Sequence, residues 1–379
     1  MTDCEIAVVG GGIAGASIAS ALVGHLAAGA VCVLEMEDSP GYHTTGRSAA
    51  LFSKTYGPAP VRALSRASEP FFKHPPDGFS DYPLLAPRGM LITARQDQED
   101  ALSRMIEELA PSEHLHVITE PQARRLCPLL RRGYATRFLW DDHAQDIDVH
   151  ALHQGFLRRV RARGGSLWCN AEVTAIARDG HGWRIETTAG DVRARLIVNA
   201  AGAWADDIAR LAGAVPVSLR PLRRSAAIIR APAGIDLSAM RMVIDVEEQF
   251  YLKPEAGTLL ISPADETLSE PCDAQPDELD IAISVDRIER AFELQVRRIE
   301  RKWAGLRSFV ADGVPVAGFD PEIDGFFWLA GQGGYGIQTA PALGQLAAAL
   351  VLGHPPISNF TDNGVVEADF SPGRLSRAT

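Results

Sequence analysis

The sequence predicts an α/β protein, α+β overall, with a Rossmann-type dinucleotide-binding domain and a second domain that is mainly an antiparallel β-sheet. Three patterns support this fold class. The N-terminus reads as strand, glycine loop, helix and strand; a second glycine-rich loop at 330–339 joins a strand to a helix; and apolar segments alternate with polar ones over 221–262. The length of 379 residues suits about two domains.

Charge and cysteine content exclude several classes of protein. The chain has 37 Lys and Arg against 48 Asp and Glu, a net charge of −11, which disfavours binding to nucleic-acid phosphates. The five cysteines are scattered and form no C-x-x-C pair, so neither a disulfide framework nor a zinc site is expected. Asp3 and Glu5 stand where a signal peptide carries positive charge, and glycines interrupt the apolar run from Ile6 to Leu34. We therefore expect a cytoplasmic protein without a transmembrane segment.

The order of elements suggests that one domain is inserted into the other in two pieces. The first domain begins with a strand at Ile6–Val9, a helix from about Ile13 to Leu26 and a strand at Val31–Leu34. Further helices are expected at Pro60–His74, Glu99–Leu109, Val149–Arg163, Glu278–Ile299 and Ile337–Leu352. Further strands are expected at Val173–Arg178, Trp183–Thr187, Arg193–Val198, Ala226–Ile229, Met242–Ile244, Phe250–Leu252, Thr258–Ile261 and Phe326–Ala330. We assign 1–82, 147–216 and 303–379 to the nucleotide-binding domain, and 83–146 and 217–302 to a substrate-binding domain.

The motif Gly10-x-Gly12-x-x-Gly15 follows the first strand and opens the first helix. Its glycines allow a tight turn, close approach of the backbone to a pyrophosphate, and close packing of helix on strand. The free N–H groups of the helix N-terminus suit the phosphates. Glu35 ends the second strand, 20 residues after Gly15, where a carboxylate accepts hydrogen bonds from ribose hydroxyls and repels a 2′-phosphate. The motif predicts a bound dinucleotide but does not separate FAD from NAD.

Three further segments point to a flavin. His43–Ala50 is rich in hydroxyls and small residues, and Arg47 within it could serve phosphates. Val198–Trp204 is a strand that runs into a small-residue loop, which places backbone against a ligand. Ala330–Thr339 holds a glycine-rich loop before a helix, whose N-terminus would stabilise the negative charge of a reduced flavin.

Together these segments resemble the FAD-dependent D-amino-acid oxidase superfamily, which includes glycine and sarcosine oxidases and D-amino-acid dehydrogenases. The resemblance spans nearly the whole chain and looks closest to D-arginine dehydrogenase-type enzymes. The segments that carry it are Gly10–Gly15, Glu35, Gly41–Ala50, Arg223–Ser225, Phe250–Pro254, Trp303–Ser308 and Gln332–Thr339.

The resemblance implies two non-contiguous domains and a bound FAD. No cysteine lies between Gly305 and Gly344, where sarcosine-oxidase relatives attach the flavin, so we expect noncovalent FAD. Val173 would contact the adenine end through its backbone. The cofactor-binding residues expected in all are Gly10, Gly12, Ile13, Ala14, Gly15, Glu35, Met36, Thr45, Gly46, Arg47, Ser48, Ala49, Val173, Ala201, Gly202, Trp204, Gly305, Gly333, Gly334, Tyr335, Gly336, Ile337 and Gln338.

The resemblance also implies a substrate site. Arg224 and Arg307 would hold the substrate carboxylate, which fits the paired charged hydrogen bonds that a guanidinium makes. Tyr56 and Tyr251 would line the site and assist. The Gly334 carbonyl would receive the substrate amine, and Gln338 would lie beside flavin and substrate. Hydride transfer from Cα to flavin N5 then depends mainly on alignment.

Two departures from the D-arginine pattern affect the expected substrate. Pro87-Arg88-Gly89-Met90 lacks the acidic residue of relatives that prefer cationic side chains, and Leu51 replaces a histidine. We therefore expect a more apolar pocket and a neutral or apolar D-amino acid, oxidised to an imino acid that hydrolyses to a 2-oxo acid and ammonia. The alternatives are a secondary amine of the sarcosine, glycine or D-proline type, or a 2-hydroxy acid. The electron acceptor would be O2 or a quinone or artificial dye.

Other readings of the chain have less support. His114, His116, His143, His150 and His153 lack convincing ligand spacing, so no metal site is expected. Ser48 and Cys169 have no nucleophile-elbow context, which disfavours a hydrolase. A noncatalytic FAD- or NAD-binding regulatory protein remains a third possibility, which purified protein with NADH affinity and no flavin would support.

Overall fold

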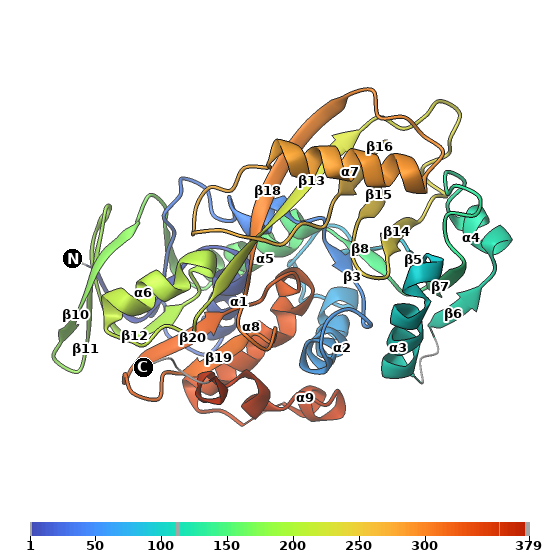
Figure 1. Cartoon of the computed structure of the whole chain (residues 1–379). Helices are drawn as coiled ribbons and strands as arrows, with labels where there is room; N and C mark the ends of the chain where they lie inside the picture. The colour runs from blue at the N-terminus through green and yellow to red at the C-terminus, as the bar shows by residue number, and fades with distance from the viewer. Residues whose placement is uncertain (1, 111–113, 356, 376–379) are drawn as a thin grey trace.

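The computed structural model describes residues 2–110, 114–355 and 357–375 (Figure 1). Its helices and strands form one large sheet in each of two regions, with a small third sheet of three strands. Figure 1 shows the sheet that contains β13 and β18 above the helices α1, α2 and α8 of the other region.

The nucleotide-binding sheet is built around β12. Parallel strands flank β12 on both sides, and the β10–β11 hairpin adds antiparallel strands at one end. Its strands are β1 (Thr2–Val9), β2 (Val31–Leu34), β9 (Ser166–Trp168), β10 (Val173–Asp179), β11 (Gly182–Thr187), β12 (Gly190–Asn199), β19 (Val316–Phe319) and β20 (Phe326–Ala330). The four residues of β2 are all buried, as a strand covered on both faces requires.

Helices cover both faces of this sheet. One face carries α1 (Ile13–Leu22), α2 (Ala59–Lys73), α5 (Val149–Ala162), α8 (Gly336–Leu352) and α9 (Ser358–Asp362), whose apolar residues share a core with β1, β2 and β20. The opposite face packs against α6 (Ala205–Ala212) and the β10–β11 hairpin. This arrangement leaves the carboxyl ends of β1, β2 and β12 facing the loops that the sequence marks as cofactor-binding.

The substrate-binding sheet joins the two inserted segments. Parallel pairing of β14 with β5 brings 217–302 beside 83–146, as the domain assignment supposes. Its strands are β5 (Met90–Ala94), β6 (Leu115–Ile118), β7 (Arg137–Asp141), β13 (Arg220–Ile229), β14 (Met242–Asp245), β15 (Tyr251–Glu255), β16 (Thr258–Ser262), β17 (Thr267–Leu268) and β18 (Ile299–Phe309). Its helices are α3 (Glu99–Leu109), α4 (Glu120–Leu126) and α7 (Glu278–Ala291). The small sheet of β3 (Leu51–Phe52), β4 (Leu85–Pro87) and β8 (Gln145–Ile147) lies where the chain passes between the regions.

The prediction of a helix over Glu278–Ile299 is wrong at its C-terminal end. The helix stops at Ala291, and a strand, β18, begins at Ile299. The charged residues of 297–302 lie on or before this strand, whose buried positions Ala304, Leu306 and Ser308 repeat every second residue. Arg307 therefore lies on a strand, and the predicted boundary between 302 and 303 falls inside β18. The domain boundaries themselves remain a prediction.

The helices and the cysteines bear on the expected absence of a membrane span and of disulfides. Among the residues that it describes, no helix is both long and apolar enough to cross a bilayer. All five cysteines are free, with Cys32 and Cys127 buried and Cys272 exposed.

Candidate active site

The glycine loop packs so closely that side chains are excluded. Gly10 has a φ of +104°, and a Cβ there would lie 2.4 Å from the Ala200 carbonyl oxygen. A Cβ on Gly15 would lie 1.9 Å from the Gly10 carbonyl oxygen. Helix α1 follows without a side-chain cap on Gly12; its first residues, Ile13 and Ala14, line the adjoining cavity, and the Ile13 N–H donates to Thr45 Oγ1 at 3.0 Å. This is the geometry that phosphate binding at a helix N-terminus needs.

Glu35 ends β2 beside this loop. Its Oε2 accepts the Gly11 N–H at 2.8 Å and its Oε1 accepts the Glu37 N–H at 3.0 Å. Burial raises the pKa of this carboxyl, while the two backbone donors act in the opposite direction. The side chain is 7% exposed and borders the first cavity of the site, where a ribose would lie if the expectation holds.

Two adjoining cavities share the lining residues Gly12, Thr44, Thr45 and Gly202 and together extend from Glu35 to Arg307; we call the pair the groove. The first cavity gathers predicted residues Gly10, Gly12, Glu35, Met36, Thr45, Val173, Ala201, Gly202 and Trp204. The second gathers Gly12, Ile13, Ala14, Thr45, Arg47, Ser48, Ala49, Gly202, Arg224, Tyr251, Gly305, Arg307, Gly333, Gly334, Gly336 and Ile337. The second also includes Thr44, Ala203, Ala226, Leu306, Ser308 and Gln332, which sequence reasoning did not single out as site residues.

The two predicted arginines come from adjacent strands. β13 pairs with β18 so that Arg224 is opposite Gly305 and Leu222 is opposite Arg307, and both arginines line the second cavity. Arg224 is 7% exposed, and its Nε is a buried donor without a protein partner. A Cβ on Gly334 would lie 2.8 Å from Arg307 Nη1, so the glycine lets the loop before α8 approach the guanidinium.

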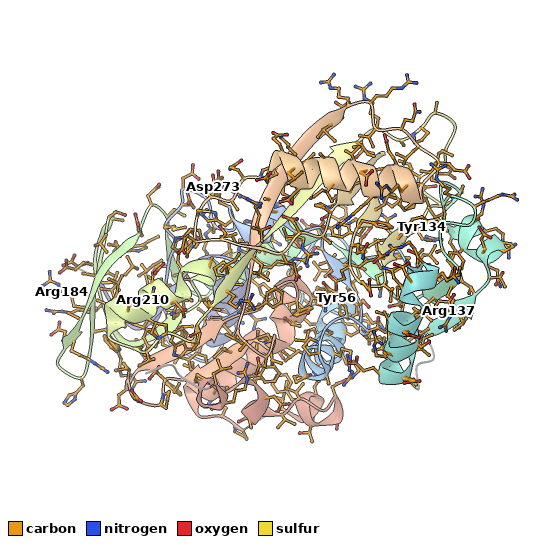
Figure 2. The ribbon with its side chains drawn as sticks, viewed as in Figure 1. Tyr56, Tyr134, Arg137, Arg184, Arg210 and Asp273 are labelled. Atoms are coloured by element: carbon orange, nitrogen blue, oxygen red, sulfur yellow. The ribbon has the colours of Figure 1, made fainter. Side chains whose placement is uncertain are left out.

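Tyr56 connects Arg307 to an acidic group. Arg307 Nη1 donates to the Tyr56 hydroxyl at 3.4 Å, and that hydroxyl donates to Glu248 Oε2 at 3.3 Å. Burial, with the Glu248 charge, raises the pKa of Tyr56, so its hydroxyl stays protonated at neutral pH. Figure 2 places Tyr56 near the upper end of α2, below the substrate-binding sheet.

Two carboxylates at the mouth of the site were not expected. Arg224 Nη2 donates to Glu266 Oε1 at 2.8 Å, and Arg224 Nη1 lies 3.6 Å from Glu248 Oε2. The expectation of a more apolar pocket rested on the absence of an acid at 87–90; Glu248 and Glu266 border a third cavity, which adjoins the groove at Arg307. The signal that was missed is the acidic pair Glu247-Glu248 between two predicted strands. Strand pairing in the sheet brings this turn close to Arg224, and the sequence alone does not show that proximity.

A buried aspartate holds Glu248 in place. Asp245 Oδ1 accepts the backbone N–H groups of Glu247 at 3.0 Å and of Gln249 at 3.3 Å, on either side of Glu248. Its carboxylate also accepts from Gln98 Nε2 at 2.9 Å. Glu248 has a φ of +54°, a left-handed conformation that a non-glycine residue keeps only when its surroundings enforce it.

The departures from the D-arginine pattern have structural explanations. Arg88 Nε donates to Asp146 Oδ2 at 2.7 Å, so this side chain is engaged in an ion pair. Leu51 packs in an apolar cluster with Ala49, Ala226 and Tyr251. One side of the site is therefore apolar and the other acidic.

Some predicted site residues have other roles in the structure. The suggestion that Arg47 serves phosphates is not supported, because its guanidinium donates to the carbonyls of Ala274 and Ala304 at 2.9 and 2.8 Å and pairs with Asp273. Gln338 is buried, and its Oε1 accepts the Ser53 N–H at 3.0 Å. Neither cavity is lined by Gly15, Gly46, Tyr56, Tyr335 or Gln338; of these, Tyr56 and Tyr335 border a third, adjoining cavity.

The groove fits a ligand rich in polar groups. Buried polar atoms without a protein partner lie along it: His43 Nδ1, Arg224 Nε, Ser308 Oγ and Gln332 Nε2. Buried polar atoms are normally hydrogen-bonded, so these mark where a ligand supplies the partners. A dinucleotide over the glycine loop, with a flat ring beside Gly333 and Gly334, fits this pattern.

The fold and the groove define a dinucleotide-dependent oxidoreductase. The sequence profile of the DAO family, described as FAD dependent oxidoreductase, matches residues 5–350, and the chain belongs to this family. The protein is therefore a FAD-dependent flavoenzyme.

Curated relatives and solved structures extend the comparison. Glycine oxidase of Geobacillus kaustophilus is 26% identical over 92% of this chain and 92% of its own length. Human mitochondrial sarcosine dehydrogenase is 26% identical over 70% of this chain but only 31% of its own length. The crystal structure of the Geobacillus glycine oxidase superposes with a TM-score of 0.82 at 23% identity over 100% of both chains, which confirms the predicted fold class. These relatives do not support the finer expectation of a D-arginine dehydrogenase type.

Proposed function

We propose that this protein oxidises a small α-amino acid at a primary or secondary amine, of the glycine, sarcosine or proline type. FAD would accept a hydride from the substrate Cα. The resulting imino acid would hydrolyse to a 2-oxo acid and ammonia or an alkylamine, or, for a cyclic imine of the proline type, open to an amino-2-oxo acid. The observation that carries the proposal is the pair of guanidiniums, Arg224 and Arg307, that line one cavity together with the loop before α8.

The arginine pair would fix the substrate by its carboxylate. Arg224 and Arg307 extend from neighbouring strands of a rigid sheet, so their separation is set by strand pairing. Burial lowers the pKa of Arg307, but interactions with Tyr56, Tyr251 and Glu248 outweigh this effect and leave the pKa above its ordinary value, so the guanidinium is charged. Charge-assisted hydrogen bonds from such groups are short and strong, and they orient the bound anion. An anchored carboxylate leaves the Cα–H bond free to be aligned with the cofactor.

Tyr56, Tyr251 and Gly334 would orient the rest of the substrate. The Tyr56 hydroxyl, protonated at neutral pH, can donate to the carboxylate as it does to Glu248. Tyr251 lines the cavity that holds Arg224 and Arg307 and is 5% exposed, whereas Tyr56 reaches this cavity through its contact with Arg307. The carbonyl of Gly334 can accept from the substrate amine, because the absence of a side chain leaves the loop close to Arg307.

The carboxylates of Glu248 and Glu266 favour a zwitterionic substrate over a simple acid. An incoming carboxylate must compete with both for Arg224, and a simple anion would leave the displaced acids unpaired. An amino acid brings an ammonium group that can offset that charge. This argues against a 2-hydroxy acid as substrate.

The names of the relatives favour glycine- and sarcosine-type amines over D-amino acids with long side chains. A neutral D-amino acid is the second candidate. The apolar cluster of Leu51, Ala226 and Tyr251 favours it, because it could receive a small hydrocarbon side chain.

Anaerobic mixing with a panel of substrates tests the proposal. The panel contains glycine, sarcosine, both prolines, D-alanine, D-arginine and L-2-hydroxyglutarate. We expect the flavin colour to disappear with a glycine-type amine and to remain unchanged with the hydroxy acid. Retained colour with every amine would refute the proposal. Admission of air, then of a quinone or dye, identifies whether O2 or another acceptor reoxidises the flavin.

A further inference from the structure

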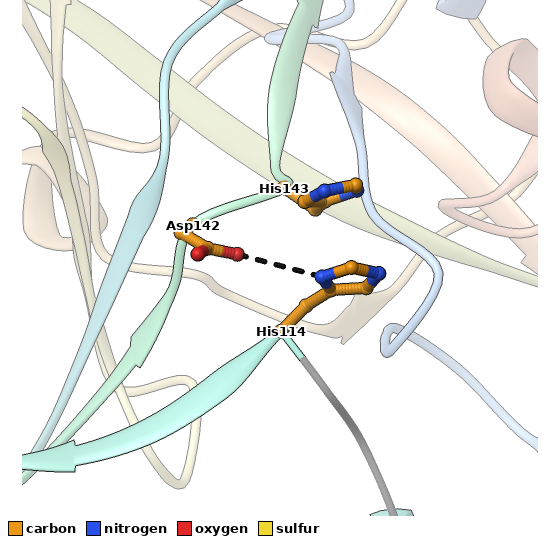
Figure 3. A group of neighbouring side chains, drawn as sticks. All are labelled: His114, Asp142 and His143. Atoms are coloured by element: carbon orange, nitrogen blue, oxygen red, sulfur yellow. Dashed lines mark ion pairs between the residues drawn. The ribbon is translucent and has the colours of Figure 1, made fainter.

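Three side chains that commonly bind metal ions meet at the edge of the substrate-binding sheet, outside the cofactor groove. His114 precedes β6, while Asp142 and His143 follow β7. One ligand atom from each lies within 4.8 Å of those of the other two. Figure 3 shows the His143 ring over the His114 ring, with Asp142 beside them. Their separation along the chain hid this grouping from sequence analysis.

Strand pairing holds the three residues together. The strands β6 and β7 pair antiparallel with Leu115 opposite Asp141, and the Asp142 N–H donates to the His114 carbonyl at 3.2 Å. The His143 N–H donates to Asp141 Oδ1 at 3.0 Å. The cluster is thus built on the end of a sheet rather than on side-chain contacts alone.

The three ligand atoms are near one another but are not yet directed at one point. His114 Nδ1 lies 3.7 Å from Asp142 Oδ1, and the two imidazole rings stack with centroids 3.4 Å apart and planes within 16° of parallel. A tetrahedral zinc ion with bonds of about 2.1 Å holds its ligand atoms about 3.4 Å apart, and it lies in the plane of each imidazole, so binding requires at least one ring to rotate out of the stack. His116 Nε2 lies 3.1 Å from Asp142 Oδ2, which leaves Oδ1 toward His114 and orients the carboxylate.

Two of the three cationic side chains that line the adjoining cavity are paired with carboxylates. Lys54 lies 3.3 Å from Glu69 Oε1, and Arg62 pairs with Glu108 at 2.7 Å. The third, Arg66, donates to the Asn363 carbonyl at 2.9 Å. Because carboxylates of the same cavity lie among them, a cation at the cluster would meet acidic as well as basic groups.

We propose that His114, Asp142 and His143 bind a divalent transition-metal ion of the zinc class. Imidazole with carboxylate suits Zn²⁺, Ni²⁺ or Cu²⁺ better than Mg²⁺ or Ca²⁺, which prefer oxygen ligands. Three protein ligands leave a position for water or a further ligand. The ion would be close to Asp141, whose Oδ2 accepts from Ser53 and Thr55 hydroxyls at 3.0 Å each, so it would brace the segment that precedes Tyr56.

Metal analysis of the full-length, FAD-loaded protein tests the site. The protein is treated with a chelator, dialysed against Zn²⁺ or against Mg²⁺, and its metal content is measured by mass spectrometry. We expect one zinc per chain, a higher melting temperature with zinc, and no bound magnesium. No stoichiometric zinc would overturn the proposal.

Variants locate the ion. His143→Gln and His114→Gln should each weaken zinc binding at least about ten-fold, and His116→Gln should weaken it less. His150→Gln, an exposed histidine on α5, should bind like the native protein. Equal zinc affinity in His143→Gln and the native protein would also overturn the proposal. Melting temperatures without metal, together with Asp142→Asn as a further ligand variant, distinguish lost binding from unfolding.

Discussion

The two halves of the groove are built in different ways. The cofactor half is centred on one local unit, where β1, the glycine loop, α1 and β2 follow one another over Thr2–Leu34, and residues such as Val173 and Gly202 complete it. The substrate half draws Tyr56, Arg224, Glu248 and Arg307 from four distant points of the chain. A local unit can carry its signal in a short motif. An assembled site depends on strand pairing between β13 and β18, which no short motif reports.

The largest effect is expected on FAD binding, from a side chain added to the glycine loop of the cofactor half. Gly15→Ala would place a Cβ 1.9 Å from the Gly10 carbonyl oxygen, so the loop cannot keep its shape. We expect the Gly15→Ala protein to purify without flavin, as measured by the loss of flavin absorbance near 450 nm. Gly180→Ala is the control, because its Cβ would meet nothing within 4 Å and only the backbone conformation is penalised. Normal flavin content in Gly15→Ala would contradict the packing argument.

In the substrate half of the groove, the largest loss of activity is expected when Arg307 is replaced. Arg307→Ala should lower kcat/KM about 100-fold or more, since loss of a buried charged contact costs on the order of 3 kcal/mol. FAD content should stay normal, which separates the two halves. Arg301→Ala, on the exposed part of the same strand, is the matched control and should change activity little. Equal losses in both variants would mean that the strand, not the guanidinium, matters.

A smaller loss is expected at Tyr56. Tyr56→Phe removes one hydroxyl that contacts both Arg307 and Glu248, so kcat/KM should fall about five-fold, equivalent to about 1 kcal/mol. Because the pKa of Tyr56 is raised above its usual value, this group does not titrate between pH 6 and 9. The pH profile of the variant should therefore keep its shape in that range. If the native profile of kcat/KM against pH shows an ionisation between pH 6 and 9 that is absent from Tyr56→Phe, Tyr56 ionises in that range and the account is contradicted.

The smallest effect is expected from the acid that competes with the substrate. Glu248→Gln removes a carboxylate 3.6 Å from Arg224, so KM should fall roughly three-fold, in line with a partly exposed ion pair. Glu247→Gln, one residue away and more exposed, is the control. A rise in KM would show that the Glu248 charge helps to hold the substrate ammonium more than it competes for Arg224.

Most of the residues predicted to bind the cofactor line the two cavities, while their roles there stay predictions. The strand at Val31–Leu34 and the strand at Phe326–Ala330 are confirmed to the residue, because their continuous apolar character is a local property. Arg224 and Arg307 were chosen through family resemblance, and the structure brings them to one cavity. Sequence reasoning missed the positions of Glu248, Glu266 and the His114 cluster. Only the pairing of strands that are distant in sequence brings these side chains to their neighbours. Arg47 lines the second cavity, and its guanidinium contacts Ala274 and Asp273 (labelled in Figure 2), which the sequence could not reveal because they lie far away in the chain.

The most direct test compares sarcosine with dimethylamine, the same amine without its carboxylate. The ratio of their kcat/KM values isolates what the anion contributes. We predict that the native enzyme prefers sarcosine by about 100-fold or more, and that this preference nearly disappears in Arg224→Ala and Arg307→Ala. A preference that survives unchanged in both variants would contradict carboxylate anchoring by these two arginines.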